Sequence, residues 1–283
     1  MTSAILLISC DDKPGLVAQI TTFIHKHNGN ILDLHQHVDK QASVFFMRVA
    51  WDLTDFKLTR EEITKQFQTI AWQHRMTWRL HFSDEPQRVA IFVSKHAHCL
   101  YDILARWQSG DFAMQIPLII SNHPDMQTAA DAFGIPYHHL PMNKQNKAEQ
   151  EKKQLALLEE NDIDLVILAR YMQILSADFV DHYANRIINV HHSFLPAFPG
   201  ARPYQQAYNR GVKIFGATSH YVTAQLDQGP IIAQDVTHAD HRDAVKDLIR
   251  KGRDLENTVL ARAVYNHLQH RVLVHGNKTV VFD

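Results

Sequence analysis

Cysteine is scarce in this sequence, and an excess of charge of either sign is absent. The 283 residues contain two cysteines, Cys10 and Cys99, one in each half of the chain. Two such cysteines form no disulfide framework and no paired zinc-binding motif, so we predict that both are reduced. The formal net charge is -1, and Lys and Arg are spread along the chain. Because no basic stripe is present to neutralise phosphates, nucleic acid is not an expected partner.

A long hydrophobic run is also missing at the start of the chain. The first ten residues carry no basic leader, and their apolar run is too short to span a bilayer. We therefore predict a cytoplasmic protein with no membrane partner.

Histidine is frequent, with 20 copies, but the usual metal-binding spacing is absent. The close pairs lack the i, i+4 spacing with a carboxylate that metalloprotease helices carry. These pairs are His96/His98, His138/His139 and His191/His192. We predict no metal site.

Apolar residues make up 45% of the chain, which is enough for a substantial core and for two domains or one large one. The first part shows apolar patterns in the order strand, helix, strand, strand, helix, strand, typical of a ferredoxin-like βαββαβ module. The strands are predicted at residues 4–9, 31–38, 43–51 and 76–82, and the helices at 16–24 and 58–73. In the second strand, Leu32, Leu34 and Val38 are predicted to share one face.

A polar segment with a proline, residues 83–87, predicts a boundary between a domain of residues 1–83 and one of residues 84–283. In the second domain, short apolar strands alternate with helices, which predicts a Rossmann-like, mostly parallel sheet covered on both faces. The strands are predicted at residues 89–93, 116–120, 135–140 and 165–169, and the helices at 97–109, 126–133, 144–160 and 242–270. A hairpin of residues 215–223 and 230–235 is predicted to carry a carboxylate, Asp227, at its tip. The fold class is therefore α/β.

Polar side chains follow a further predicted strand of this sheet, in residues 187–200. A short apolar run leads into an amide, two imidazoles and a hydroxyl before prolines and a glycine end regular structure. The polar residues are Asn189, His191, His192 and Ser193, and the terminating residues are Pro196, Pro199 and Gly200. In open α/β sheets, ligands bind beyond the carboxyl ends of the strands. The alternative is a strand and a proline-rich turn with surface histidines.

Several separated motifs together resemble the formyltetrahydrofolate-dependent formyltransferase fold. They are Asn189-x-His191, residues 193–196, residues 216–220 and residues 226–230. Residues 12–17 resemble the loop of ACT domains, small regulatory modules that bind amino acids. An ACT module ahead of this fold is similar to the formyltetrahydrofolate deformylase family. The resemblance implies hydrolysis of 10-formyltetrahydrofolate, as substrate rather than cofactor, to formate and tetrahydrofolate, which would supply formate for purine biosynthesis and balance one-carbon pools.

The same resemblance implies Asn189, His191 and Asp227 as the catalytic set, and the chemistry of these side chains agrees. Attack on a formyl carbon builds an oxyanion, which Asn189 and a protonated His191 could stabilise as donors. Asp227 could position and deprotonate water while holding the imidazole. Ser193 is an alternative nucleophile, but it lacks a nucleophile elbow and is predicted to be a turn hydroxyl that bonds backbone.

The folate contacts follow from the resemblance alone. The segment Met172, Gln173, Ile174 and Leu175, together with Leu226, is similar to a pterin-binding wall. The alternative for these residues is a place in the core. His220 resembles a residue that lines the active site, and its alternative is a hydrogen-bonded strand histidine.

For the first domain, the resemblance implies an amino-acid effector near Asp12 and Gly15. A four-stranded sheet with two helices on one face leaves its other face and an edge available, so we expect a homo-oligomer.

Two other functions remain open. A glycinamide ribonucleotide formyltransferase needs a glycine-rich loop for the phosphate, but residues 93–100, which include Lys95 and His96, contain no glycine. The transferases also commonly carry proline where this chain has His192. A non-catalytic folate or amino-acid sensor is the third function, and the intact catalytic set argues against it.

Overall fold

The computed structural model describes residues 2–197 and 202–283, so the predicted Pro199–Gly200 stop lies outside the described residues. The chain forms two compact units. One contains the chain up to Pro86 together with His270–Leu273 and Val280–Asp283. The other contains Gln87–Gln269 and Val274–Thr279. From sequence, residues 270–273 and 280–283 are predicted to lie in the second domain, whereas here they belong to the first unit. The domain boundary after residue 83 remains a prediction.

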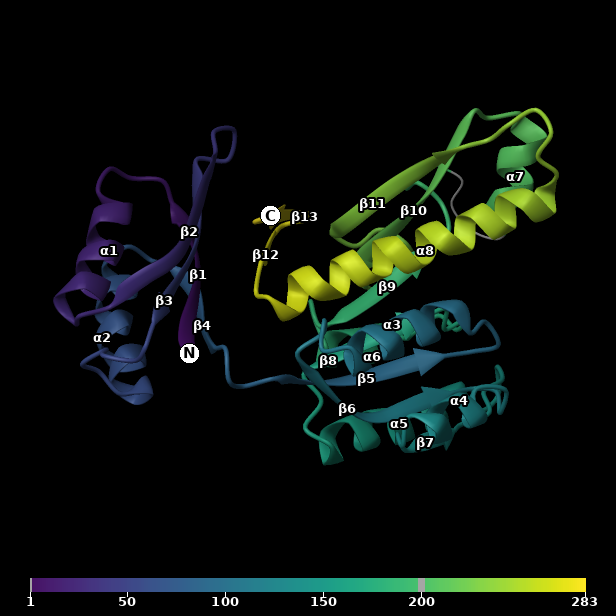
Figure 1. Cartoon of the computed structure of the whole chain (residues 1–283), viewed down its shortest axis with the longest axis horizontal. Coiled ribbons are helices and arrows are strands. Elements are labelled where there is room, and N and C mark those ends of the chain that lie inside the picture. The colour runs from purple at the N-terminus through teal and green to yellow at the C-terminus, as the bar shows by residue number, and fades with distance from the viewer. Residues whose placement is uncertain (1, 198–201) are drawn as a thin grey trace. The chain divides into compact units, whose positions relative to one another are not determined.

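The first unit has the predicted βαββαβ order (Figure 1). Its elements are β1 (Ser3–Asp11), α1 (Leu16–Lys26), β2 (Asn30–Asp39), β3 (Val44–Asp52), α2 (Arg60–Gln73) and β4 (Thr77–Phe82). The strands form an antiparallel sheet in the order β2-β3-β1-β4. Apolar side chains from alternate strand positions, such as Met47 and Trp51, pack with Ile20 and Phe67 of the two helices. The ferredoxin-like prediction is confirmed.

The predicted face of β2 is wrong at Leu32. The pairing of β2 with β3 shifts register between Ile31 and Asp33, as a β-bulge does. A one-residue shift moves a side chain to the opposite face of a sheet. Ile31, Leu34 and Val38 therefore pack against the core, while Leu32 is 47% exposed.

The sequence predicts that the second face of this sheet is available, and that prediction is wrong. The buried side chains of Leu7, on β1, and Phe46, on β3, pack with Phe282. Leu273 and Val280 extend the same cluster. The backbone of residue 270 also takes part, because buried Arg48 donates from Nε to the His270 carbonyl at 3.0 Å. Residues distant in sequence thus complete the first unit.

Phe282→Ala should therefore destabilise the first unit by about 3 kcal/mol, the usual scale for removing a buried phenylalanine. Urea unfolding followed by tryptophan fluorescence suits this test, because Trp51, Trp72 and Trp78 all lie in this unit. Leu32→Ala is the matched control, and we expect it to change stability by no more than about 0.5 kcal/mol. Equal effects of the two substitutions would contradict the packing assigned to Phe282.

The second unit has a seven-stranded sheet in the order β11-β10-β9-β8-β5-β6-β7. Strands β5 to β9 pair in parallel, and β10 and β11 add an antiparallel hairpin, so the mostly parallel prediction is confirmed. The strands are β5 (Gln87–Val93), β6 (Met114–Ser121), β7 (Tyr137–His139), β8 (Leu165–Ala169), β9 (Ile187–His191), β10 (Ile214–Tyr221) and β11 (Ile231–His238). A small separate hairpin of β12 (Val272–His275) and β13 (Lys278–Val281) turns at Gly276.

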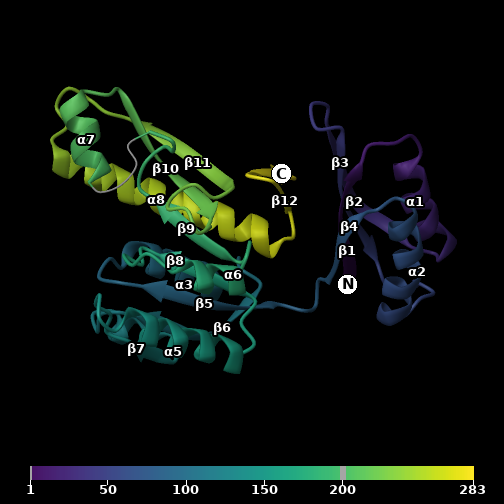
Figure 2. The same cartoon turned by 180° about the vertical axis from the view of Figure 1, so that it is seen from behind.

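Helices lie on both faces of the seven-stranded sheet (Figure 2). They are α3 (His98–Gln108), α4 (Gln127–Ala132), α5 (Lys147–Glu160), α6 (Ala177–His182), α7 (Pro203–Arg210) and α8 (Val245–Leu268). The short helices α6 and α7 were not predicted. In the described residues, no helix is both long and apolar enough to cross a membrane. The parallel strands β8 and β9 end beside the β10–β11 hairpin, where the predicted polar residues lie.

Candidate active site

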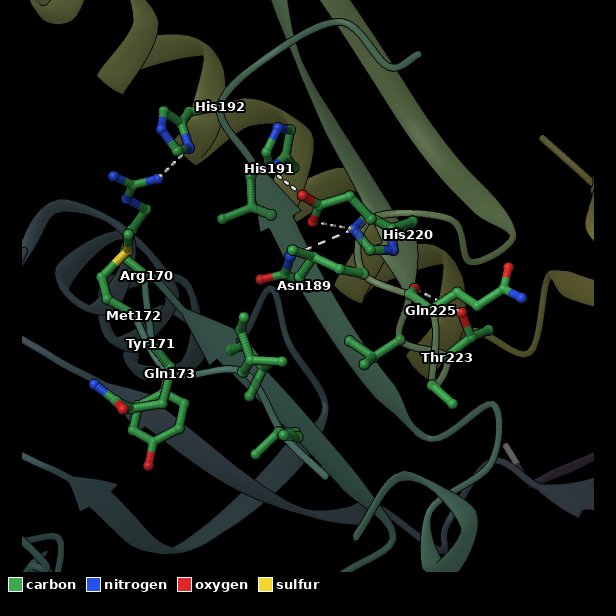
Figure 3. A pocket seen from close by; sticks show the side chains of 18 of the residues that line it. Arg170, Tyr171, Met172, Gln173, Asn189, His191, His192, His220, Thr223 and Gln225 are labelled. Atoms are coloured by element: carbon green, nitrogen blue, oxygen red, sulfur yellow. Dashed lines mark hydrogen bonds and ion pairs between the residues drawn. The ribbon is translucent and has the colours of Figure 1, made fainter. Parts of the chain in front are cut away.

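Three of the predicted site residues meet where β9 ends. Asn189 and His191 are two positions apart on β9, and the connection from β10 to β11 brings Asp227 over them. His191 Nδ1 lies 3.3 Å from Asp227 Oδ2 (Figure 3). His220 pairs with Asn189 across the strands, and its Nε2 lies 3.4 Å from Asn189 Nδ2 and 3.8 Å from Asp227 Oδ1. The fold thus brings one amide, two imidazoles and one carboxylate together.

The backbone of the β10–β11 connection fixes the position of Asp227. Asp227 has a φ of 55°, in the left-handed region that few residues other than Gly, Asn and Asp adopt. Two residues later, a Cβ on Gly229 would lie 1.7 Å from the carbonyl oxygen of Tyr221. Only glycine fits there, so the carboxylate is held on a connection that passes close against β10.

Burial and neighbouring charges shift the pKa values of Asp227 and His220. Burial alone would raise the pKa of Asp227, but the hydrogen bond and charge of His191 outweigh it and leave that pKa below its ordinary value. Burial lowers the pKa of His220. His220 Nδ1 lies 2.9 Å from the Tyr221 carbonyl oxygen, so the neutral ring carries its proton there and leaves Nε2 as an acceptor for the Asn189 amide. Asp227 therefore stays ionised beside the two histidines.

An adjoining cavity of about 580 Å³ is lined by all the predicted folate-contact residues. Met172, Ile174 and Leu226 are 53%, 61% and 54% exposed, which is unusual for large apolar side chains gathered at one place. Leu175 also belongs to the core. The backbone N–H of Met172 donates to Ser94 Oγ at 3.0 Å, so the loop is tied to the sheet.

Hydrogen bonds from β10 and β11 hold the chain that follows His191. Thr218 Oγ1 donates to the Ser193 carbonyl at 2.8 Å and accepts from the Leu195 N–H at 3.0 Å. Gln234 Nε2 donates to the Leu195 carbonyl at 3.0 Å. The Ser193 hydroxyl is buried and has no hydrogen-bond partner within the described ranges, so the prediction that it bonds backbone is wrong. Its carbonyl, instead of its hydroxyl, makes the stabilising bond.

A second group of charges, which the sequence did not reveal, lies behind His192. Arg170 Nη1 donates to His192 Nδ1 at 2.8 Å, and Arg170 Nε lies 3.3 Å from Glu256 Oε2. Tyr204 Oη donates to Glu256 Oε1 at 2.5 Å, and His98 Nε2 lies 2.8 Å from Oε2. Burial and the Arg170 charge lower the pKa of His192 to about 3. His192 is therefore neutral and accepts from Arg170.

Glu256 is the centre of this group and is only 1% exposed. Burial raises its pKa, but the His98 and Tyr204 hydrogen bonds and the Arg170 charge outweigh it and lower the pKa to about 2. Its ligand atom and those of His98 and Cys99 lie within 4.8 Å of one another. However, Arg170 already compensates the carboxylate, and burial raises the pKa of the Cys99 thiol. This group is poorly suited to a cation.

Glu256→Gln should destabilise the second unit by about 3–5 kcal/mol near neutral pH, because it leaves Arg170 buried without its counter-charge. A carboxyl whose folded pKa is depressed stabilises the fold above its unfolded pKa and stops doing so as pH falls through the folded value. The difference between wild type and variant should thus shrink between about pH 4.5 and about pH 2. Urea unfolding followed by circular dichroism measures it. Glu149→Gln, on the surface of α5, is the control, and an equal loss there would contradict this account.

The two predicted effector residues lie in the first unit. Asp12 is exposed, and its N–H donates to the Ser43 carbonyl at 2.9 Å. Gly15 has a φ of 91° and immediately precedes α1. The left-handed conformation of Gly15 lets the loop turn into the helix. A residue with a Cβ would be strained in that conformation.

Comparison with known proteins decides the family. A family model described as formyl transferase matches residues 87–264, and one described as ACT domain matches residues 4–68. A formyltetrahydrofolate deformylase of a Synechocystis species is 59% identical over 280 residues, which cover 99% of this chain and 98% of that relative. The chain belongs to the formyltetrahydrofolate deformylase family.

Solved structures place the deformylase family beside the transferases. The crystal structure of a formyltetrahydrofolate deformylase from Pseudomonas syringae has a TM-score of 0.98 at 43% identity, covering 100% of this chain and 95% of that one. Glycinamide ribonucleotide transformylase 1 from Symbiobacterium toebii has a TM-score of 0.67 at 29% identity, covering 72% of this chain and 98% of that one. Both the deformylase family and the fold class predicted from sequence are confirmed.

Proposed function

We propose that this protein hydrolyses 10-formyltetrahydrofolate to formate and tetrahydrofolate. The observation that carries the proposal is the group of Asn189, His191 and Asp227 at the edge of an apolar cavity of about 580 Å³. Its volume lies in the range of sites for small molecules and cofactors. Within the described ranges, His191 Nε2 is buried without a hydrogen-bond partner. Buried polar atoms usually have a hydrogen-bond partner, so we propose that a substrate oxygen supplies one here.

The reaction needs a nucleophile, a proton acceptor and donors for the developing oxyanion. Water attacks the formyl carbon, and Asp227, ionised beside His191, receives its proton. Asn189 Nδ2 and protonated His191 donate to the oxyanion of the tetrahedral intermediate. The bond from the formyl carbon to N10 then breaks, N10 takes up the proton that Asp227 received, and formic acid leaves and ionises to formate. Hydrolysis is not a redox reaction and needs no electron carrier, so we propose that no cofactor takes part.

The cavity accounts for recognition of the folate. Exposed Met172, Ile174 and Leu226 offer apolar surface for the flat heterocycle, while Gln173 and the backbone of the loop supply polar groups. His220 lines the cavity and lies between Asn189 and Asp227. We propose that these residues bind the pterin.

Incubation of the purified protein with 10-formyltetrahydrofolate, with and without glycinamide ribonucleotide, tests the proposal. We expect formate and tetrahydrofolate in both reactions and no formylglycinamide ribonucleotide. Formylated ribonucleotide would indicate a transferase. Tight folate binding without turnover would indicate a sensor.

For the first unit, we propose an amino-acid effector near Asp12 and Gly15, together with self-association of the subunits. A match to the ACT domain over residues 4–68 supports the first, and the position of β2 and β4 as the outer strands of the four-stranded sheet supports the second. Both cysteines are unpaired, which fits our proposal that the protein acts in the reducing cytoplasm.

Asp12→Ala should weaken amino-acid binding at least about tenfold without changing formate release in the absence of effector. Calorimetric titration of the full chain with the amino acids measures binding, and light scattering measures assembly. Asp55→Ala, in an exposed turn of the same unit, is the control. A monomer at all concentrations, or equal binding by both variants, would contradict these proposals.

A further inference from the structure

The charged group behind His192 has no part in the proposed reaction, yet it reaches the cavity. Arg170 and His192 line the cavity, and Glu256, Tyr204 and His98 lie behind them. In Figure 3, Arg170 and His192 lie on one side of the catalytic residues, and Thr223 and Gln225 lie on the other. Met172 lies beside Arg170 in the same view, so apolar and polar groups are interleaved in the lining, and Arg170 and His192 belong to its polar part.

The position of Arg170 and His192 in the lining bears on which nucleophile reaches the formyl carbon. The body of the folate belongs against the apolar residues, so an acceptor must approach along the polar part of the lining, to which Arg170 and His192 belong. Amines are better nucleophiles than water. A hydrolase must therefore keep amines away from a carbon that its own residues have activated.

We propose that Arg170, fixed by Glu256 and His192, determines acceptor specificity by filling the acceptor side of the site, so that water is the nucleophile that fits. This inference rests on the proposed function. It also gives His192 a role, because a neutral His192 accepts the hydrogen bond that holds the Arg170 guanidinium across the site.

The packing of the group keeps Arg170 in place. Arg170 is 9% exposed and has a φ of 61°, so its side chain leaves β8 from a left-handed backbone. Tyr204 reaches Glu256 across Gly252 of α8, where a Cβ would lie 2.1 Å from Tyr204 Oη. His98 reaches the same carboxylate from the start of α3. Contacts from α7 and α3 thus hold the carboxylate of α8, and the carboxylate holds Arg170.

His98 comes from the stretch of residues 93–100 that lacks glycine. A glycine-rich loop there would offer backbone N–H groups to a phosphate. In this chain an imidazole occupies the position and bonds to Glu256 instead. The same stretch thus supplies a group that holds Glu256, which in turn pairs with Arg170.

The test compares two double variants that differ only at residue 170. Arg170→Ala with Glu256→Gln shortens the side chain and removes both charges together, which avoids leaving one charge buried alone. Arg170→Met with Glu256→Gln removes the same charges but keeps most of the side-chain length. Gln at 256 can still bond to Tyr204 and His98.

Hydroxylamine is the probe acceptor. Its nitrogen bonds to the formyl carbon as the carbon–N10 bond breaks, N10 gains the proton that the nitrogen loses, and the products are N-hydroxyformamide and tetrahydrofolate. The measured quantity is the ratio of N-hydroxyformamide to formate. We expect the Arg170→Ala pair to raise this ratio roughly tenfold or more over wild type, and the Arg170→Met pair to change it little.

An unchanged ratio in the Arg170→Ala pair would overturn the inference, and so would an equal rise in both pairs. Should the Ala pair fail to fold, wild type alone decides. N-hydroxyformamide formed by wild type in the ratio seen for uncatalysed 10-formyltetrahydrofolate would show that nothing excludes the amine, whereas a much lower ratio would support the inference. If wild type releases no formate, the proposed function itself fails.

Discussion

Asp227→Asn should lower turnover by at least ~10²-fold, the usual scale for losing a general base, while the fold and folate affinity persist. The amide is nearly isosteric with the carboxylate, but it takes no proton from water and carries no charge to hold protonated His191. His191 Nδ1 lies 3.3 Å from this carboxylate, so the loss acts on two groups at once. Single-turnover formate release measures the effect, and equilibrium binding of a folate separates binding from chemistry.

Asp235→Asn is the matched control, because Asp235 lies on β11 of the same hairpin and pairs with Arg262 at 3.1 Å near the surface. Its turnover should stay within about twofold of wild type, since surface ion pairs contribute little. Near-normal formate release by Asp227→Asn would remove Asp227 from the catalytic set. A large loss in both variants would indicate damage to the hairpin instead of lost chemistry.

Asn189→Ala and His191→Ala should each lower kcat by roughly 10²- to 10³-fold, because each removes a donor to the oxyanion. We expect KM to change little, since the donors act mainly on charge that develops in the transition state. Steady-state kinetics of formate release measure both constants. A rise in KM with unchanged kcat would make these residues binding groups.

His241→Ala serves as the control for the histidine, because its ring is exposed and pairs with Asp240 at the surface. It should keep wild-type kinetics. The double variant of Asn189 and His191 should lose less than the product of the single losses, because the two donors serve one oxygen. Strict multiplication of the losses would argue that they act on separate steps.

Local pattern predicted most of the fold. Strand alternation, as at Met47 and Trp51, and helical spacing, as at Ile63 and Phe67, both arise because one face of the element is buried. Such patterns can be recognised within a short stretch of sequence. The strand end that holds Asn189 and His191 and the hairpin tip that holds Asp227 are local features too. Their catalytic roles came from the family resemblance and remain predictions. Helices α6 and α7 were missed because six and eight residues give little periodicity.

Features that depend on distant pairs could not be predicted. Glu256, Arg170, Tyr204 and His98 come from α8, the end of β8, α7 and α3, and no local pattern marks them as neighbours. The available signal was a Glu at a position of α8 that shares the helix face of its apolar residues, where Glu is rarely found. The exposure of Leu32 depends on a bulge, which shifts one residue without any sign in the apolar alternation.

The packing of Phe282 against Leu7 and Phe46 has a consequence for the order of events during synthesis. Domains generally fold as units, the N-terminal one first, as the chain leaves the ribosome. Here the first unit lacks part of its apolar cover until residues 270–283 have been made. We expect the nascent sheet to persist with Leu7 and Phe46 uncovered while the second unit is translated. During that interval, the uncovered apolar surface would make the nascent chain prone to aggregation.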